Sequence, residues 1–241
     1  MYAVFKRELF SFLSSMVAYI TIGVFLLVSG LLLWFFPDTS LLDYGYADLS
    51  GFFSLAPYLF MFLIPAITMR SFAEERREGT YELLVTRPIT VWQIIGAKYL
   101  ACLLLVLLAL IPTLIYCYSI SSLGYPQGNL DSGAVIGSYI GLFLLGAAFT
   151  SIGIFASSLT KNQVIAFVIC AALCAFVFLG FDYSSQLIAF QSVEGVISGL
   201  GINQHYNAIS RGVLDTRDLI YFITLSSIFL LFTKLIIGGK R

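Results

Sequence analysis

Residues Met69 to Lys98 read MRSFAEERREGTYELLVTRPITVWQIIGAK and form the longest charge-rich segment of an otherwise apolar chain. The segment lies between two hydrophobic runs, each long enough to cross a bilayer. A charged and compact loop between two membrane spans must face an aqueous compartment. Its side chains therefore form a candidate docking surface for a partner protein.

The composition of the chain is that of a membrane protein. Hydrophobic residues make up 59% of its 241 residues and charged residues only 11%, which is too little charge to cover a soluble protein of this length. A helix needs about 20 apolar residues to cross a bilayer. Six runs meet this requirement: Val17 to Phe36, Gly51 to Met69, Leu100 to Tyr118, Val135 to Leu159, Val164 to Phe181 and Leu219 to Ile237. We therefore predict a single all-α, polytopic membrane domain with six transmembrane helices.

The distribution of basic residues predicts the orientation of the spans. Eleven of the thirteen Lys and Arg residues lie near the two termini, in the loop 70–98 or in the turn at Lys161. The loops 37–50 and 119–134 contain neither Lys nor Arg. By the positive-inside rule, both termini and the charged loop are expected in the cytoplasm. Arg211 and Arg217 are the exceptions.

The N-terminal segment 1–15 precedes the first span and has helical spacing. Its apolar side chains recur every three or four residues, at Tyr2, Phe5, Leu9, Phe12 and Met16. This pattern predicts a short amphipathic helix that lies in the cytoplasmic interface. The alternative is that these residues form the first turns of a longer first span.

The outer segment 182–218 is semi-apolar and too long for a turn, which predicts one or two short helices dipping into the outer leaflet. They would form either a gate for cargo or a cap that seals the bundle. His205, the only histidine, has no metal-binding partners in the sequence, so we expect a structural hydrogen bond from it. Arg211 and Asp215 are four residues apart and are expected to form a stabilising pair on a helix.

The charged loop 70–98 divides into three parts. Arg70 to Glu78 is a polar helical run that ends at Gly79. The next part, 80–85, exposes large apolar side chains, and Thr90 is the expected cap of a helix that leads into the third span. Charges beside apolar anchors suit a shallow groove on a partner, whereas the alternative is a solvated loop. We predict a coupling surface made of Arg70, Glu74, Glu75, Arg76, Arg77, Gly79, Thr80, Glu82 and Leu83.

Several functions lack the residues that they need. The chain has no GxxxxGK[ST] phosphate loop, so any ATP would have to be bound and hydrolysed by another subunit. The six runs contain no His, Asp or Glu, which argues against an enzyme acting within the membrane. A net charge of zero argues against a nucleic-acid partner. The four cysteines lie in apolar runs and are expected to pack there rather than to bind a metal.

The fourth run is rich in small residues, which allow helices to approach closely. They are Gly137, Ser138, Gly141, Gly146, Ala147 and Ser151. This stripe could be a contact between two copies of the chain, or it could be packing within one copy.

The pattern MRSFAEERREGTYELLVTRPIT, followed by GAKYL at 96–100, resembles the cytoplasmic loop of type-two ATP-binding-cassette permeases. These six-span subunits of exporters have no ATPase domain of their own. Four further segments are similar to permeases of this family associated with gliding motility in bacteria: NLD at 129–131, GIFASSLT at 153–160, GINQHY at 201–206 and SRGVLDTRDLIYF at 210–222. The resemblance covers essentially the whole chain. It implies a coupling helix around residues 70–84, an interfacial N-terminal helix and a partly re-entrant outer segment.

We therefore expect the permease subunit of an exporter in a bacterial inner membrane. The resemblance implies cytoplasmic ATP-binding-cassette ATPase subunits as partners, and no cofactor bound by the permease itself. Because six spans are few for enclosing a large pathway, a second permease copy or a related membrane subunit is also expected. The alternative is a scaffold or mechanotransmission subunit of an envelope or motility complex that transports nothing.

Overall fold

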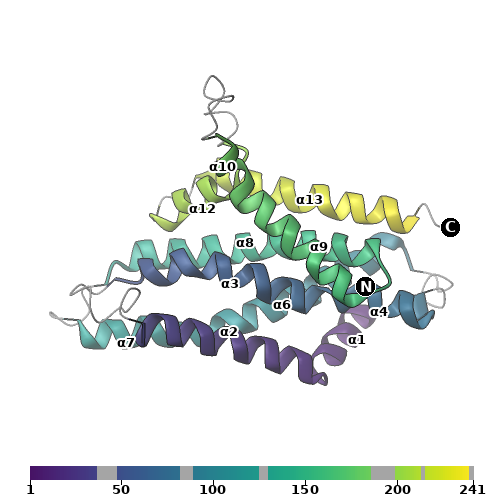
Figure 1. Ribbon diagram of the computed structural model, residues 1–241, viewed down its shortest axis with the longest axis horizontal. Helices are drawn as coiled ribbons and strands as arrows, with labels where there is room; N and C mark the ends of the chain where they lie inside the picture. The colour runs from purple at the N-terminus through teal and green to yellow at the C-terminus, as the bar shows by residue number, and fades with distance from the viewer. Residues whose placement is uncertain (37–47, 82–88, 125–129, 186–198, 213–214, 239–241) are drawn as a thin grey trace.

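The structure is a computed structural model that describes residues 1–36, 48–81, 89–124, 130–185, 199–212 and 215–238 (Figure 1). These residues are almost entirely helical and contain no strand. Six helical stretches among them are long and apolar enough to cross a membrane: Met16–Trp34, Ser50–Glu78, Val91–Leu123, Ser132–Leu159, Gln163–Ser184 and Thr216–Gly238. The prediction of an all-α protein with six spans is confirmed.

The long helices run side by side along the longest axis of the molecule (Figure 1). In chain order the elements are α1 (Tyr2–Leu13), α2 (Met16–Trp34), α3 (Ser50–Thr68), α4 (Arg70–Glu78), α6 (Val91–Leu110), η2 (Ile111–Thr113), α7 (Leu114–Leu123), α8 (Ser132–Leu159), α9 (Gln163–Ala175), η3 (Phe176–Gly180), α10 (Phe181–Ser185), α12 (Ile202–Ser210) and α13 (Thr216–Gly238). Figure 1 places α1, α4 and the two chain termini at one end, and α7 and α12 at the other. We call these the α4 end and the α12 end.

Side-chain caps begin several helices outside the apolar runs of the sequence. Thr90 accepts a hydrogen bond from the Gln93 backbone N–H and forms a capping box with the Gln93 side chain, so α6 begins at Val91, well before the predicted span at Leu100. Asp131 likewise accepts from the first N–H groups of α8, and Asn162 caps α9. Hydropathy marks the part of a helix that fits lipid, whereas the caps mark where the helix begins.

Helix α8 is the centre of the bundle and packs against α3, α4, α6, α9, α12 and α13. Of its most apolar stretch 72% is buried, against 22% for α2 and for α13. The small residues of α8 allow this packing, because a Cβ at Gly146 would lie 2.9 Å from the side chain of Val106 and one at Gly153 would overlap that of Thr68. Gly137 and Gly141 likewise contact Ile209. The stripe of small residues therefore packs within one chain.

Prolines interrupt two of the spans. Pro112 lies in the 3-10 segment η2, which separates α6 from α7, and Pro57 and Pro65 lie inside α3. Because Pro57 has no N–H, the carbonyl group of Phe53 loses its partner within the helix. The hydroxyl group of Tyr206 donates to this carbonyl oxygen at 2.6 Å, which joins α12 to α3.

Helix α1 is separate from the first span, because Ser14 ends it and Ser15 caps α2. Its face against the protein carries Val4, Glu8 and Phe12, which are buried. Of the predicted apolar face, Phe12 therefore packs inside, whereas Tyr2 and Met16 are 76% and 80% exposed. The location of α1 in a membrane interface stays a prediction.

Candidate coupling site at the α4 end

One residue, Met69, separates α3 from α4, and it provides no side-chain cap for α4. The first N–H groups of a helix have no partner within it and need one from elsewhere. Ser157, near the end of α8, supplies it: its hydroxyl oxygen accepts from the N–H groups of Phe72 at 2.9 Å and Ala73 at 3.1 Å. The same hydroxyl donates to the carbonyl oxygen of Met69 at 3.0 Å. A side chain distant in sequence thus caps α4 and fixes it to α8.

A second contact joins α4 to the same end of α8. The guanidinium group of Arg76 donates to the carbonyl oxygen of Ser158 and lies over the ring of Tyr81, 5.7 Å from its centroid. Carbonyl groups in the last turn of a helix lack intrahelical donors, and the C-terminal end of a helix dipole attracts cations. Arg76 therefore satisfies the end of α8 while Ser157 satisfies the beginning of α4.

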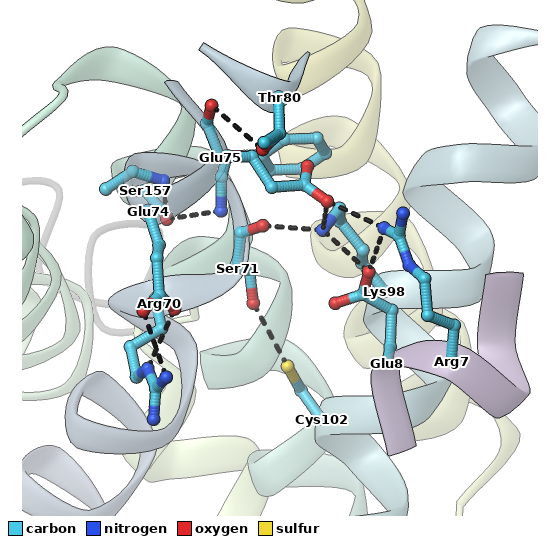
Figure 2. A network of polar contacts seen from close by, with 12 residues as sticks. Arg7, Glu8, Arg70, Ser71, Glu74, Glu75, Thr80, Lys98, Cys102 and Ser157 are labelled. Carbon is cyan, nitrogen blue, oxygen red and sulfur yellow. Dashed lines mark hydrogen bonds and ion pairs between the residues drawn. The ribbon is translucent and has the colours of Figure 1, made fainter. Parts of the chain in front are cut away.

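A buried network of charges holds the other side of α4 (Figure 2). The ammonium group of Lys98 lies 3.1 Å from Glu8 Oε1 and 3.0 Å from Glu75 Oε1, and it donates to the Ser71 carbonyl oxygen at 2.6 Å. Arg7 Nη2 lies 2.6 Å from the same Glu8 oxygen and 2.7 Å from the same Glu75 oxygen. Two cations and two carboxylates therefore meet where α1, α4 and α6 come together.

Three of the four charged side chains in this network are largely buried. The side chain of Lys98 is 1% exposed, and those of Glu8 and Glu75 are 10% and 15% exposed. The Lys98 ammonium group donates to one neutral acceptor, the Ser71 carbonyl oxygen, and lies within ion-pair distance of two carboxylates. The ammonium group also lies 5.1 Å from the centroid of the Phe72 ring. The ammonium group of Lys98 is therefore surrounded inside the bundle by carboxylates from both α1 and α4.

Arg7 completes the charge balance at the exposed side of the network. Burial by itself lowers the pKa of Arg7. Hydrogen bonds and charge interactions with Glu8 and Glu75 together raise the pKa by more than burial lowers it, so that it lies above the ordinary value. Arg7 therefore stays cationic. Among the buried side-chain atoms of the described residues, Glu75 Oε2 alone has no hydrogen-bond partner.

The structure divides the predicted coupling residues into two groups. Arg70 and Glu74 pair with each other, with Arg70 Nε 2.9 Å from Glu74 Oε2, and Glu75 and Arg76 make the contacts described above. Arg77, Gly79 and Thr80 are exposed, and so is Glu78, which the sequence analysis did not include. Gly79 ends α4 with a φ of 72°, in the left-handed region that favours glycine. Glu82 and Leu83 lie outside the described residues.

Sequence reasoning missed four members of the site: Arg7, Glu8, Lys98 and Ser157. Arg7 counted only toward the orientation of the spans. Lys98 was assigned only a topological role, although apolar residues precede and follow it and the Thr90 cap already predicted a helix through it. Glu8 is the one acidic residue before the first span, which was a weak signal of a specific partner. Ser157 had no signal, because serine is common in membrane helices.

The predicted outer residues lie at the α12 end. His205 Nδ1 lies 2.6 Å from Asp218 Oδ1 and His205 Nε2 lies 2.9 Å from the Gly199 carbonyl oxygen. The imidazole ring is stacked on that of Tyr221, with 4.0 Å between centroids. His205 therefore makes structural hydrogen bonds of the expected kind, and Asp218 is a partner that the sequence analysis did not assign.

The predicted pair of Arg211 and Asp215 is wrong. The two residues do not share a helix: α12 ends at Ser210, and Gly212 follows with a φ of 84°. Asp215 instead accepts a hydrogen bond from the N–H group of Arg217, at the beginning of α13. No ion pair among the described residues joins Arg211 to Asp215. The outer segment's apolar residues at 193, 196 and 197 lie outside the described part of the chain.

Comparison with known proteins agrees with this architecture. A family described as ABC-2 family transporter protein matches residues 37–239, which is well over half of the chain and includes α3, α4 and α8. A search of curated proteins finds no match. The matched region begins after α2, so Glu8 and Arg7 lie outside it. Six apolar helices and this match show that the chain belongs to the ABC-2 transporter family, as a multi-pass membrane permease subunit that pairs with a cytoplasmic ATPase subunit.

Proposed function

We propose that this permease subunit is part of an exporter in a bacterial inner membrane, with its α4 end in the cytoplasm, and that the exposed C-terminal turn of α4 docks the ATPase subunit. The observation that carries this proposal is the asymmetry of α4. Ser157, Arg76 and the Lys98 network hold the beginning and two sides of the helix, while Arg77, Glu78, Gly79 and Thr80 at its C-terminal end are exposed. A helix fixed in this way transmits a push on its free turn to the bundle.

The orientation rests on the distribution of charge. Lys6, Arg7, Lys161 and the basic residues of α4 belong to the end that carries both termini, and the positive-inside rule assigns such an end to the cytoplasm. The chain has no phosphate-binding loop, so we propose that the partner subunit alone binds and hydrolyses ATP. We also propose a second permease copy or a related membrane subunit. Because the glycines of α8 pack inside one chain, we propose that this second subunit contacts another surface.

A more specific role, association with gliding motility, rests on the resemblance of four segments: 129–131, 153–160, 201–206 and 210–222. Under this proposal the exporter supplies the motility apparatus or performs mechanical work on it. A non-transporting scaffold would use the same spans and the same docking turn. The two differ in whether ATP turnover depends on the contact with α4.

The test is ATPase turnover of the subunit that co-purifies with the chain, measured with the native permease and with Arg77→Glu. A reversed charge at a docked ion pair costs at least about 1.4 kcal/mol, which corresponds to a tenfold weaker association. We therefore expect at least a tenfold loss of co-purified ATPase or of permease-dependent turnover. Arg77 is preferable to Glu75 for this test, because a change at Glu75 would also disrupt the buried network.

Arg211→Glu is the matched control, since it reverses an exposed arginine at the α12 end. Its ATPase association and turnover should equal those of the native complex. Normal assembly and turnover in the Arg77→Glu complex would show that the ATPase docks elsewhere. Stable association without any effect of the permease on turnover would favour the scaffold.

A further inference from the structure

Helix α8 bonds directly to α4 at one end and to α12 at the other. At the α4 end Ser157 binds the backbone of Met69, Phe72 and Ala73. At the α12 end the hydroxyl group of Ser138 donates to the Ser210 carbonyl oxygen at 2.9 Å. A Cβ at Gly137 would lie 3.0 Å from the Ile209 carbonyl oxygen, so backbone meets backbone there. Both contacts are short and leave little space for the helices to slide.

Two other helical stretches contact both α4 and α12, and both are interrupted. Helix α3 continues into α4 and reaches α12 through Tyr206, but Pro57 and Pro65 remove two of its backbone hydrogen bonds. The stretch of α9 and η3 also contacts α4 and α12, but it changes to a π-helix at Phe176–Gly180. Helix α8 has 28 residues without a proline, which at about 1.5 Å per residue gives a continuous rod of about 42 Å. Helices bend at prolines and at π-bulges, and α8 is the connection that contains neither.

We propose that α8 carries displacements of α4 to α12, and that Ser157 is the positioning residue that joins α4 to this rod. The proposal rests on the proposed function, because the displacement arises when the ATPase subunit moves the free turn of α4. Its output is the position of α12, which carries His205 and Tyr206. The Lys98 network has a different role: it holds α4 against α6 and α1 on the side away from α8.

The first test uses the full chain with its co-purifying ATPase in lipid nanodiscs. Asn207, exposed on α12, is replaced by cysteine, and its reaction rate with a membrane-impermeant maleimide is measured with and without ATP. We expect the rate to depend on ATP in the native background. In Ser157→Ala that dependence should be weakened, because α4 then keeps only the hydrogen bond from Arg76 to the end of α8.

Ser158→Ala is the matched control for this experiment. It removes the neighbouring buried hydroxyl, which donates to the Phe155 carbonyl oxygen of its own helix. This variant should keep the native ATP dependence of labelling. An unchanged ATP dependence in Ser157→Ala would overturn the proposal and would indicate that α3, which is continuous with α4, carries the displacement.

A second test needs no ATPase, so it remains decisive if the docking proposal fails. Hydrogen–deuterium exchange of the chain alone should be faster in Ser157→Ala at Phe72 and Ala73, whose N–H groups lose their acceptor, and also in α12. Ser138→Ala, which weakens the other end, should raise exchange in α12 only. Faster exchange at α4 in Ser157→Ala with native exchange in α12 would overturn the rod. Loss of ATPase association in Arg77→Glu concerns docking alone and is read separately.

Discussion

The α4 end and the α12 end of this permease are held in place by different means. At the α4 end a lysine, an arginine and two glutamates from three helices share one buried network. At the α12 end the contacts are neutral backbone approaches at Gly137 and Gly141 and hydrogen bonds from Ser138 and Tyr206. Both ends are closely held, but the first depends on a network of four charged groups, whereas the second has one buried carboxylate, Asp218, against His205.

This difference matters for movement. Long charged side chains can exchange hydrogen bonds and follow a displacement of their helix, whereas backbone atoms in contact repel steeply when they are pushed together. The α4 end is therefore suited to receive a displacement and the α12 end to follow it as a unit with α8. The charged network also has the larger penalty for a missing member, because a buried charge without a partner is costly.

The largest expected effect comes from removing the cation at the centre of the α4 end. Lys98→Met leaves the carboxylates of Glu8 and Glu75 buried with Arg7 as their only cation, and we expect a loss of about 3 kcal/mol or more in the free energy of unfolding. The measurement is unfolding of the purified protein in detergent. Removal of the charges together, in Lys98→Met with Glu8→Gln and Glu75→Gln, should restore much of the stability.

Lys234→Met is the control for this change, because it replaces an exposed lysine on α13 that lies 5.1 Å from the centroid of the Trp92 ring. Its expected cost is at most about 1 kcal/mol. Equal losses for Lys98→Met and Lys234→Met would contradict the distinction between a buried network and a surface contact.

A smaller effect is expected from breaking the close packing at the α12 end. In Gly137→Ala the new Cβ would lie 3.0 Å from the Gly212 Cα and the Ile209 carbonyl oxygen, where only backbone can give way. We expect a loss of about 1–3 kcal/mol, which is typical of an overpacked contact, together with faster hydrogen exchange in α12. Gly23→Ala on α2, where no atom lies within 4 Å, should be neutral or stabilise by up to about 1 kcal/mol. A harmless Gly137→Ala would show that α12 is loosely held.

The smallest effect concerns one hydrogen bond. Tyr206→Phe removes the donor to the Phe53 carbonyl group, which Pro57 leaves without a helical partner, and should cost about 1 kcal/mol. In the background Pro57→Ala the helix can supply its own N–H, so the same change should cost less. A double-mutant cycle of thermal unfolding measures this difference. Additive losses would mean that the tyrosine hydroxyl does not replace the bond that proline removes.

Much of the helical framework was predictable because its causes are local. Runs of apolar residues gave the spans, Gly79 the end of α4 and Thr90 the beginning of α6. Each feature depends on residues within one or two turns. The predicted pair of Arg211 and Asp215 was also a local prediction, and it was wrong. Residues four apart lie close together only within a continuous helix, and α12 ends at Ser210, before Gly212 with its positive φ.

The candidate site was predictable only in outline. The sequence located a charged segment between two spans, but it did not show that Glu75 and Arg76 face the bundle while Arg77 faces outward. That distinction depends on Ser157 and Lys98, which lie on other helices and approach α4 only after the bundle has formed. Charge counts alone cannot separate a docking residue from an internal ion pair, because both use the same residue types.

By itself, the sequence determined that this is a six-span helical membrane protein with a charged loop between its second and third spans, since hydropathy and caps act over short stretches of chain. Only the tertiary structure decided which charges are internal, that Ser157 caps α4 from another helix, and that the small residues of α8 pack within one chain. These outcomes depend on the register and rotation of helices far apart in sequence, and burial then selects the partner that satisfies each polar group.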